Sequence, residues 1–388
     1  MGNSTAAPYG DLVTGGERNL EELKQEVQRR AERNMPPVGG IMPEDARAAL
    51  AAIDSLSREQ WAQAWSSVAE RHFAKAQSLE TSDRATAVDE YWHAWRVHHF
   101  ARWPVENTPA KRHSKQRALD AFRQYCRLLD PVMEVVRIPF EGKEIVAYLR
   151  LPASPRPAPV VLGIAGLDSR KEDVVAYSDR YLKHGIAIIA VDLPGTGESP
   201  HESAQVTSDR MFSAVLDYLE THPGIDGKRM VVQGRSASGY WAAKLAYTER
   251  ARLRGAVVHG GAVHQSFQPE WMRPALKTGE YLYDYFEAKE KTWGASGLED
   301  LIEKSKRFSL LDQGLLDQPS APMLVANGAR DSQTTVADVF LLLEHGDAKE
   351  AWVNPKGGHM GRSPEWSGSA ISEKVVMPWI VRRLEGNG

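Results

Sequence analysis

The sequence predicts an α/β fold with a mostly parallel, eight-stranded sheet, joined to an N-terminal helical domain. From residue 134 to the C-terminus, short apolar runs alternate with amphipathic stretches, which is typical of parallel strands connected by helices. Residues 18–131 instead contain aromatic residues at helical spacing. We therefore expect a loose tail over 1–17, a helical cap domain over 18–131 and a sheet core over 132–388.

The elements of the core follow one another along the chain. A β-hairpin is predicted over 134–152, because two alternating runs flank the turn Glu141-Gly142. Buried strands are expected at 158–166, 186–191, 229–233, 253–261, 322–328 and 350–354. Helices are expected at 171–185, 208–219, 239–247, 335–346 and 372–384.

One connection of the predicted core is unusually long. Residues 265–318 separate two predicted strands. Connections of this length are commonly functional lids. We therefore expect a helical lid here, with an aromatic surface suited to an aryl or polyketide-like substrate. Its aromatic residues are Phe267, Trp271, Tyr281, Tyr283, Tyr285, Phe286 and Trp293.

The strand over 229–233 leads into a serine with small neighbours. Gly234 lies two residues before Ser236 and Ser238 two residues after it, and a predicted helix follows. A sharp strand-to-helix turn of this kind, a nucleophile elbow, lifts the serine hydroxyl above the sheet and requires small residues at both flanking positions. Ser238 stands where glycine is usual, so its hydroxyl must contact neighbouring backbone.

A serine is a nucleophile at neutral pH only when a base and an orienting acid accompany it. The strand over 322–328 leads to Asp331, and the strand over 350–354 leads to His359. The order Ser236, Asp331, His359 is that of α/β-hydrolases. Taken singly, a serine after a strand is usually a turn residue or a helix N-cap, and an aspartate or histidine in a loop is usually a solvated connector. Taken together at strand ends, the three predict a catalytic triad and an α/β-hydrolase fold.

A triad of this type needs backbone donors for the oxyanion. We expect one to be the N–H of Ala237, which follows the nucleophile. The other should come from the loop after the strand over 158–166, from either Leu167 or Gly166.

Several segments resemble known families. The segment DLPGTGES at 192–199 and the order of the triad are similar to the α/β-hydrolase superfamily. The segments EYWHAWRVHHFARWP at 90–104, AGLDSRKED at 165–173 and GRSASG at 234–239 resemble the group of 2,6-dihydroxypseudooxynicotine hydrolase and the fungal polyketide chain-shortening hydrolases. The resemblance implies cleavage of a carbon-carbon bond next to a ketone. Ser238 in place of glycine and Asp168 in place of glutamate depart from that group.

Five residues are candidates for substrate contacts. Asp168 lies in the loop expected to supply an oxyanion donor, and His264 and Trp271 lie at the start of the long insertion. Trp95 and His99 lie on one face of a predicted helix. That face either forms a helix-helix core or roofs a pocket over Ser236.

These features leave two classes of function open. The first is a serine hydrolase that forms an acyl-enzyme. The resemblance favours cleavage of a carbon-carbon bond in an aryl or polyketide-like ketone, and the alternative is a carboxylesterase or acyltransferase that acts on an aromatic ester. The second is a non-catalytic ligand-binding protein on a hydrolase scaffold. An intact set of Ser236, Asp331 and His359 favours the enzyme.

Composition excludes several partners. The net charge of -3 gives no basic surface for nucleic acid, and no apolar run is long enough to span a membrane. The single cysteine, Cys126, excludes an internal disulfide and is typical of the cytoplasm. The histidines lack the spacing of a helical zinc site, so we expect neither a metal nor a cofactor. The sequence leaves open whether the protein is a monomer or a homodimer.

Overall fold

The structure, a computed structural model, describes residues 18–386 and separates them into two compact units. The helical unit consists of residues up to Met133 together with Tyr281–Ala288, and the sheet unit begins at Glu134 and contains the rest. The long insertion expected as one lid over 265–318 is therefore divided, because residues 281–288 group with the helical unit. The tail expected over 1–17 lies outside the described residues.

Residues 18–133 of the helical unit form five helices, α1 (Leu20–Glu32), α2 (Pro43–Ala51), α3 (Arg58–Leu79), α4 (Arg84–Ala101) and α5 (Pro109–Leu128). Four of them begin at a side chain that caps the first turn. Asn19, Ser57, Asp83 and Thr108 each accept a hydrogen bond from a backbone N–H three residues later. Trp61, Trp65 and Trp95 are fully buried, so the aromatic residues of this region form the core of the unit.

The segment Tyr281–Ala288 is held in the helical unit by contacts between aromatic rings and by ion pairs. The ring of Tyr283 lies 5.8 Å from that of Trp61 and 5.1 Å from that of Trp103. The Asp284 carboxylate accepts hydrogen bonds from Arg58 Nε at 2.9 Å and Lys111 Nζ at 2.7 Å. These contacts explain why a piece of the insertion belongs to the helical unit rather than to the sheet unit.

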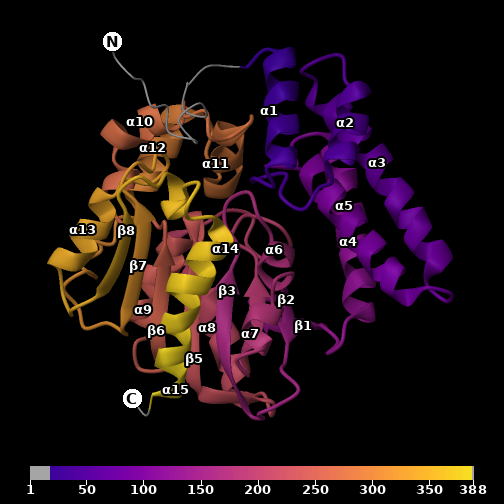
Figure 1. Cartoon of the computed structure of the whole chain (residues 1–388). Helices are drawn as coiled ribbons and strands as arrows, with labels where there is room; N and C mark the ends of the chain where they lie inside the picture. Colours follow the sequence, from indigo (N-terminus) through magenta and orange to yellow (C-terminus); the bar gives the residue numbers. More distant parts are fainter. Residues whose placement is uncertain (1–17, 387–388) are drawn as a thin grey trace. The chain divides into compact units, whose positions relative to one another are not determined.

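The sheet has eight strands in the order β1-β2-β4-β3-β5-β6-β7-β8 (Figure 1). The pairs β1-β2 and β2-β4 are antiparallel, and all other neighbours are parallel. The predicted hairpin is therefore confirmed as an antiparallel edge. The strands are β1 (Glu134–Phe140), β2 (Lys143–Arg150), β3 (Ala158–Ile164), β4 (Ala187–Val191), β5 (Ile225–Arg235), β6 (Leu253–His259), β7 (Met323–Gly328) and β8 (Glu350–Asn354).

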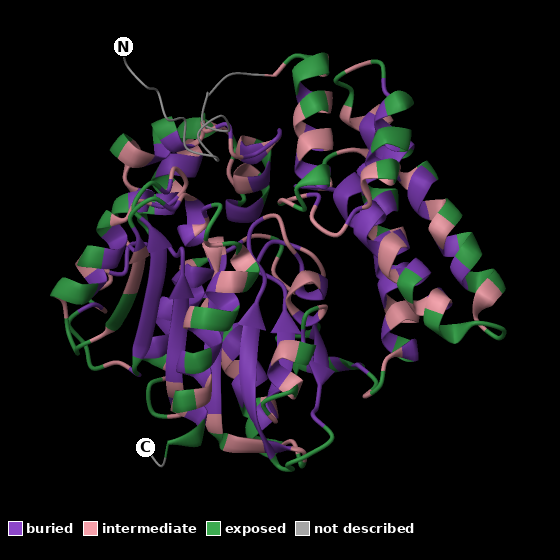
Figure 2. Ribbon diagram, in the orientation of Figure 1, coloured by how far each residue is buried: buried purple, intermediate pink, exposed green. Residues whose placement is uncertain are grey.

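Helices cover both faces of the sheet. In Figure 1, α15 crosses the near face, and α8 and α9 lie on the far face. Every residue of β3, β4 and β7 is buried (Figure 2), which explains why these strands are continuous apolar runs. The α-helices of the sheet unit are α6 (Lys171–Val175), α7 (Asp179–Leu182), α8 (Arg210–Thr221), α9 (Gly239–Thr248), α10 (Pro269–Ala275), α12 (Leu298–Lys306), α13 (Ala337–Glu344), α14 (Gly368–Ile371) and α15 (Met377–Glu385).

Short helical turns complete the unit. They are η2 (Val206–Asp209), η3 (Ser236–Ser238), η4 (Gln265–Phe267), η5 (His359–Gly361) and the π-helical turn η6 (Ser372–Val376). Helix α11 (Tyr285–Trp293) begins in the segment that groups with the helical unit and ends in the sheet unit. No helix in residues 18–386 is both long enough and apolar enough to cross a membrane.

Two predicted helices differ from the structure. The single helix expected over 171–185 is wrong, because α6 and α7 are separate and a turn at 176–178 divides them. Arg150 of β2 binds this turn, donating to the Ser178 hydroxyl at 2.9 Å and pairing with Asp179. The expected helix is thus interrupted at a turn that is bound by a residue distant in the sequence. The helix expected over 372–384 starts with the π-helical turn η6.

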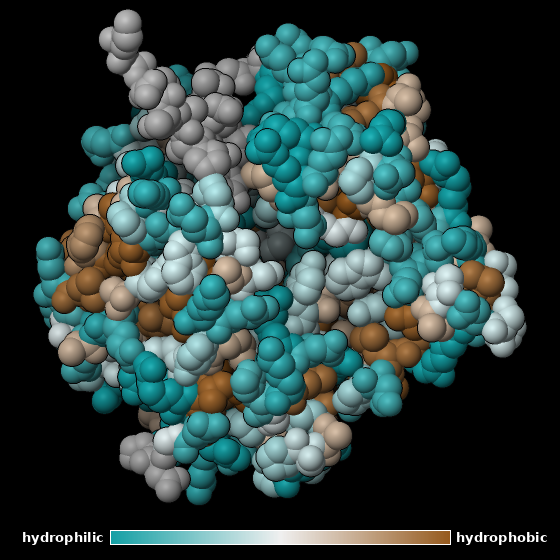
Figure 3. Space-filling model, in the orientation of Figure 1, coloured by the Kyte–Doolittle hydropathy of each residue, from teal (hydrophilic) through white to brown (hydrophobic). Residues whose placement is uncertain are grey.

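One helix keeps apolar side chains at the surface. Phe340 and Leu343 of α13 are 50% and 38% exposed. Figure 3 shows hydrophobic residues gathered on the side of the molecule where Figure 1 places α13. The periodicity of α13 therefore predicted a helix correctly but did not indicate which of its apolar residues are buried.

The backbone crossing at Gly234 predicts the effect of one added methyl group. A Cβ atom at Gly234 would lie 2.0 Å from the Ser238 carbonyl oxygen, which is backbone and cannot move aside. We expect Gly234→Ala to lower the free energy of unfolding by about 3 kcal/mol, as overpacking does. Urea unfolding followed by circular dichroism measures this.

The matched control is Gly368→Ala. Among the described residues nothing lies within 4 Å of a Cβ at Gly368. Equal stability of the two variants would contradict the backbone crossing.

Candidate active site

Strand β5 ends at Arg235, and Ser236 follows in a strained backbone conformation. Its φ of 56° lies in the left-handed region, which a residue other than glycine rarely adopts. The turn η3 and helix α9 continue directly from it. Such strain persists only where the surroundings enforce it, and it places the serine side chain at the carboxyl end of the sheet.

Ser238 is accommodated by its hydroxyl. The Ser238 Oγ atom accepts a hydrogen bond from the Arg235 amide at 2.8 Å and lies 2.8 Å from the Ile164 carbonyl oxygen, to which it donates. The expected contact with neighbouring backbone is therefore present. The hydroxyl links the end of β5 to the end of β3, a link that glycine at this position would lack.

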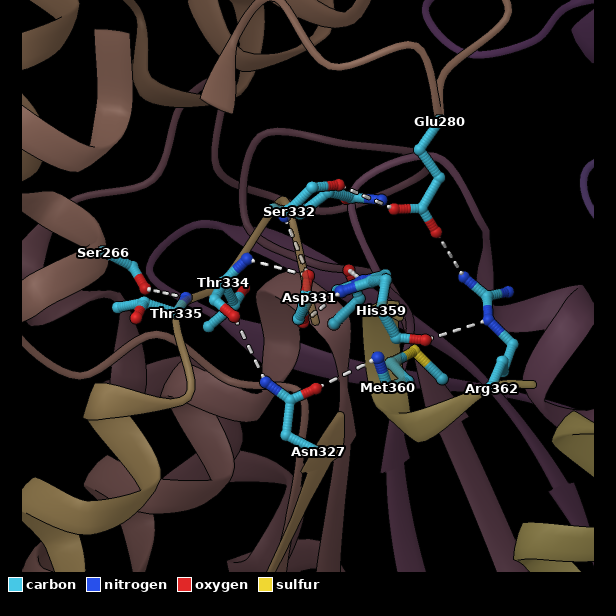
Figure 4. Close-up of polar contacts among 12 residues, drawn as sticks. Ser266, Glu280, Asn327, Asp331, Ser332, Thr334, Thr335, His359, Met360 and Arg362 are labelled. Carbon is cyan, nitrogen blue, oxygen red and sulfur yellow. Dashed lines mark hydrogen bonds and ion pairs between the residues drawn. The ribbon is translucent and has the colours of Figure 1, made fainter. Parts of the chain in front are cut away.

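The three residues predicted as a triad lie together at the ends of β5, β7 and β8. His359 Nε2 is 2.7 Å from Ser236 Oγ, and His359 Nδ1 is 2.8 Å from Asp331 Oδ2. The side chains of Asp331 and His359 are buried, whereas Ser236 is partly exposed. Figure 4 shows Asp331 and His359 side by side at the centre of a network of polar contacts.

Backbone amides and Asn327 fix the two loops that supply Asp331 and His359. The second carboxylate oxygen of Asp331 accepts hydrogen bonds from the amides of Gln333 at 2.8 Å and Thr334 at 3.1 Å. The Asn327 side chain donates to the Thr334 carbonyl at 3.2 Å and accepts from the Met360 amide at 3.1 Å (Figure 4). The sequence reasoning missed Asn327, although a polar residue inside a buried apolar strand was a usable signal.

The sequence reasoning also missed two residues near His359, namely Arg362 and Glu280. Arg362 Nε donates to the His359 carbonyl at 3.0 Å, and Arg362 Nη2 lies 3.1 Å from a Glu280 carboxylate oxygen. The other Glu280 oxygen accepts from the Ser332 hydroxyl at 3.3 Å. Glu280 thus links the loop of Asp331 to the loop of His359 (Figure 4). No sequence pattern joins residues 82 positions apart, so this link had no signal.

The charges of the site shift its two titrating groups in opposite directions. Burial alone would raise the pKa of Asp331, but the charge of His359 and its hydrogen bond lower it below the ordinary value. Burial alone would lower the pKa of His359, but Asp331 first and Glu280 next raise it above the ordinary value, with Arg362 opposing. The pair therefore favours an ionised aspartate next to an imidazole that readily accepts a proton.

The expected oxyanion donors differ in availability. The Gly166 amide donates to the Ser169 hydroxyl at 2.7 Å, so it has no hydrogen left for a ligand. Of the two candidates in that loop, Leu167 is left. Ala237 lies in the first turn that follows the nucleophile, where backbone N–H groups have no intrahelical acceptor. Ala237 and Leu167 therefore remain the candidate pair.

The residues expected to contact substrate lie in both units. In the sheet unit, Asp168 lies in the loop after β3, the His264 ring is 2.7 Å from the Ser309 hydroxyl, and Trp271 Nε1 donates to the Gln333 carbonyl at 3.2 Å. In the helical unit, Trp95 is fully buried, and a guanidinium nitrogen of Arg102 lies 2.6 Å from His99 Nε2. Within residues 18–386 no group of three or more His, Cys, Asp or Glu is arranged to hold a metal ion.

Comparisons with known proteins place the chain in a family. The model of the FrsA-like esterases matches residues 51–349. Esterase FrsA of Vibrio parahaemolyticus serotype O3:K6 (strain RIMD 2210633) is 24% identical over 298 residues, which cover 75% of this chain and 70% of the relative. The family match, over residues 51–349, extends through most of the helical unit as well as the sheet unit.

Two solved structures share the fold over nearly the whole chain. The crystal structure of 2,6-dihydroxy-pseudo-oxynicotine hydrolase has a TM-score of 0.74 at 22% identity and covers 90% of this chain and 94% of its own. AbyA5 has a TM-score of 0.69 at 21% identity, with coverages of 94% and 93%. The α/β-hydrolase fold predicted from the sequence is confirmed.

The position of Glu280 predicts a change in the titration of His359. A nearby carboxylate favours the protonated imidazole, so Glu280→Gln removes this support and should lower the pKa of His359. NMR titration of ring-labelled histidines, with the His359 signal assigned from a His359→Gln spectrum, measures the pKa directly.

Glu270→Gln is the control, because Glu270 is an exposed residue of the same insertion. An unchanged or raised pKa of His359 in the Glu280→Gln protein would contradict the predicted direction.

Proposed function

The chain belongs to the FrsA-like esterase family, and from this membership and the geometry at Ser236 we propose that it is a serine hydrolase that works through an acyl-enzyme. The observation that supports the proposal most directly is the pair of short hydrogen bonds joining Ser236 to His359 and His359 to Asp331. A nucleophile, a base within hydrogen-bond reach and an acid that orients the base are what acyl transfer requires.

In the first step of the proposed reaction, His359 Nε2 takes the proton of the Ser236 hydroxyl as Oγ attacks the substrate carbonyl. Asp331 accepts the hydrogen bond of Nδ1–H, which holds the tautomer that leaves Nε2 free to act as a base. The amides that bind the second Asp331 oxygen keep this carboxylate oriented. The imidazolium then returns its proton to the leaving group, and a water activated by His359 releases the acid.

The oxyanion of the tetrahedral intermediate needs fixed donors. We assign this role to the backbone N–H groups of Ala237 and Leu167, since Gly166 is already bonded to Ser169. Each such donor contributes on the order of 10² to 10³ in turnover.

The bond we favour is a carboxylic ester. The family and the relatives that match it are named esterases, and an ester needs only the groups described above. An alcohol or phenol departs readily once the imidazolium protonates it. Transfer of the acyl group to an alcohol or amine in place of water uses the same intermediate.

A carbon-carbon bond next to a ketone is the second candidate. The sequence resemblance implies it, and the match to 94% of the chain of 2,6-dihydroxy-pseudo-oxynicotine hydrolase, helical unit included, favours it. Here the imidazolium of His359 would protonate a departing carbanion. That step requires a substrate whose ring or second carbonyl spreads the negative charge. An aromatic substrate and a cytoplasmic location stay predictions.

The two candidates predict different substrates for the same serine. Purified protein offered aryl acetates and aryl β-diketones in parallel should cleave the esters faster if the ester proposal is right. Ser236→Ala should lower kcat on the preferred substrate by about 10⁴-fold or more. Its control is Ser213→Ala, which removes a hydroxyl on α8 that is bonded to Glu249 and should leave kcat unchanged.

Faster cleavage of the diketones would favour the second candidate. A wild-type rate in the Ser236→Ala protein on both substrate classes would overturn the serine mechanism altogether.

The two partners of the serine should contribute unequally. His359→Ala removes the base itself, whereas Asp331→Asn retains the imidazole and alters only its tautomer and charge. We expect Asp331→Asn to reduce kcat by about 10⁴-fold and His359→Ala by more. Steady-state kinetics above pH 7 compare the two. A larger loss for Asp331→Asn would contradict the assignment of His359 as the base.

A further inference from the structure

A small pocket in the sheet unit lies apart from the three residues of the proposed triad. Strands β3, β5 and β6 line it on the sheet side, and α6, α7, α14 and η6 line it on the helix side. Neither Ser236, Asp331 nor His359 is among its lining residues. Its free volume is about 20 Å³, enough for one or two water molecules.

Arg235, the residue before Ser236, lines this pocket, and its guanidinium lacks a hydrogen-bond acceptor among the described residues. Within residues 18–386, no side chain or carbonyl accepts a hydrogen bond from its guanidinium. The one carboxylate that lines the pocket belongs to Asp173, and one of its oxygens accepts from the Arg170 amide at 2.8 Å. Arg235 is partly exposed, so ions from the solvent can reach its guanidinium, and a guanidinium whose N–H donors have no protein acceptor is a binding group for an anion.

A second arginine adds to the positive charge. Arg180 also lines the pocket, and it is held there by bonds to the Ser372 hydroxyl at 2.7 Å and the Tyr177 carbonyl at 3.1 Å. Burial first, and the charge of Arg180 next, lower the pKa of Arg235. Two cations therefore face one carboxylate, which leaves an excess of one positive charge.

The other polar groups of the pocket are uncharged and bond within the protein. The Tyr181 hydroxyl donates to the Gln233 side-chain oxygen at 2.6 Å. His259 Nε2 bonds to the Met360 carbonyl at 2.8 Å, and burial lowers its pKa to about 3. His259 is therefore uncharged at neutral pH and does not change the balance of charge.

We propose that this pocket binds one small monovalent anion, of which chloride is the common example, on the guanidinium of Arg235. The excess of one positive charge matches a monovalent ion, and the free volume of about 20 Å³ suits an ion of one atom. Arg235 immediately precedes Ser236, and His259 binds the residue after His359. The bound ion thus stabilises the turn behind the nucleophile without contacting substrate.

Bromide is the probe that locates the ion directly. Crystals of the full chain soaked in sodium bromide should show an anomalous peak within hydrogen-bond distance of the Arg235 guanidinium. Absence of a peak in this pocket, with bromide bound elsewhere on the protein, would overturn the proposal.

A solution measurement separates specific binding from a general salt effect. Thermal unfolding of the wild-type protein is followed as sodium bromide replaces sodium gluconate at constant ionic strength, because gluconate is too large for the pocket. The melting temperature should rise and saturate. In Arg235→Gln the apparent affinity should fall by at least about tenfold, since a hydrogen bond to a charged group is lost.

Arg229→Gln is the matched control, because Arg229 lies on the same strand but pairs with Asp226 outside the pocket. It should retain the response of the wild type. If Arg235→Gln does not fold, Arg180→Gln serves instead and should also bind bromide more weakly. An equal response of the wild type and both pocket variants would contradict an ion bound at Arg235. The test is independent of the proposed hydrolase activity, because Ser236→Ala should keep the full response.

Discussion

At Gly234 the backbone of β5 passes so close to the Ser238 carbonyl that a side chain would lie 2.0 Å from the oxygen. This crossing forces the chain from strand to helix within a few residues and holds Ser236 at a φ of 56°. The Ser238 hydroxyl then ties the turn to the Arg235 amide and the Ile164 carbonyl. A flexible loop would not place the serine hydroxyl 2.7 Å from His359, so the geometry of the site depends on this rigid turn.

The parallel sheet supplies the rest of the site. Strands β5, β7 and β8 run in one direction, so the residues that follow them meet at one edge. Proximity alone does not fix orientation, however. Asn327 fastens the loops of Asp331 and His359 to each other, and Glu280 with Arg362 adds a second connection between them. These links show how a loop-built site becomes as well defined as the strands beneath it.

The long insertion has two roles rather than one. Residues up to Glu280 contact the loops around the proposed triad, whereas the next eight residues pack into the helical unit through Tyr283 and Asp284. The two units are therefore joined by chain connections on both sides of this segment as well as at Glu134. The family match extends into both units, which indicates that the helical unit belongs to the architecture that the family shares.

Local patterns of apolar runs and small residues were enough to predict the succession of strands and helices along the chain, the elbow at Ser236 and the positions of Asp331 and His359. The sequence also anticipated that Ser238 would bond to backbone. The folded loop after β3 showed which amide is left to bind an oxyanion, because the Gly166 amide already donates its hydrogen bond to the Ser169 hydroxyl. The tertiary structure likewise revealed the Glu280–Arg362 link, the break between α6 and α7, and the unpaired charge of Arg235. The Glu280–Arg362 link and the contact of Arg150 with the turn between α6 and α7 join residues far apart in the chain, and local patterns hold no information about such contacts.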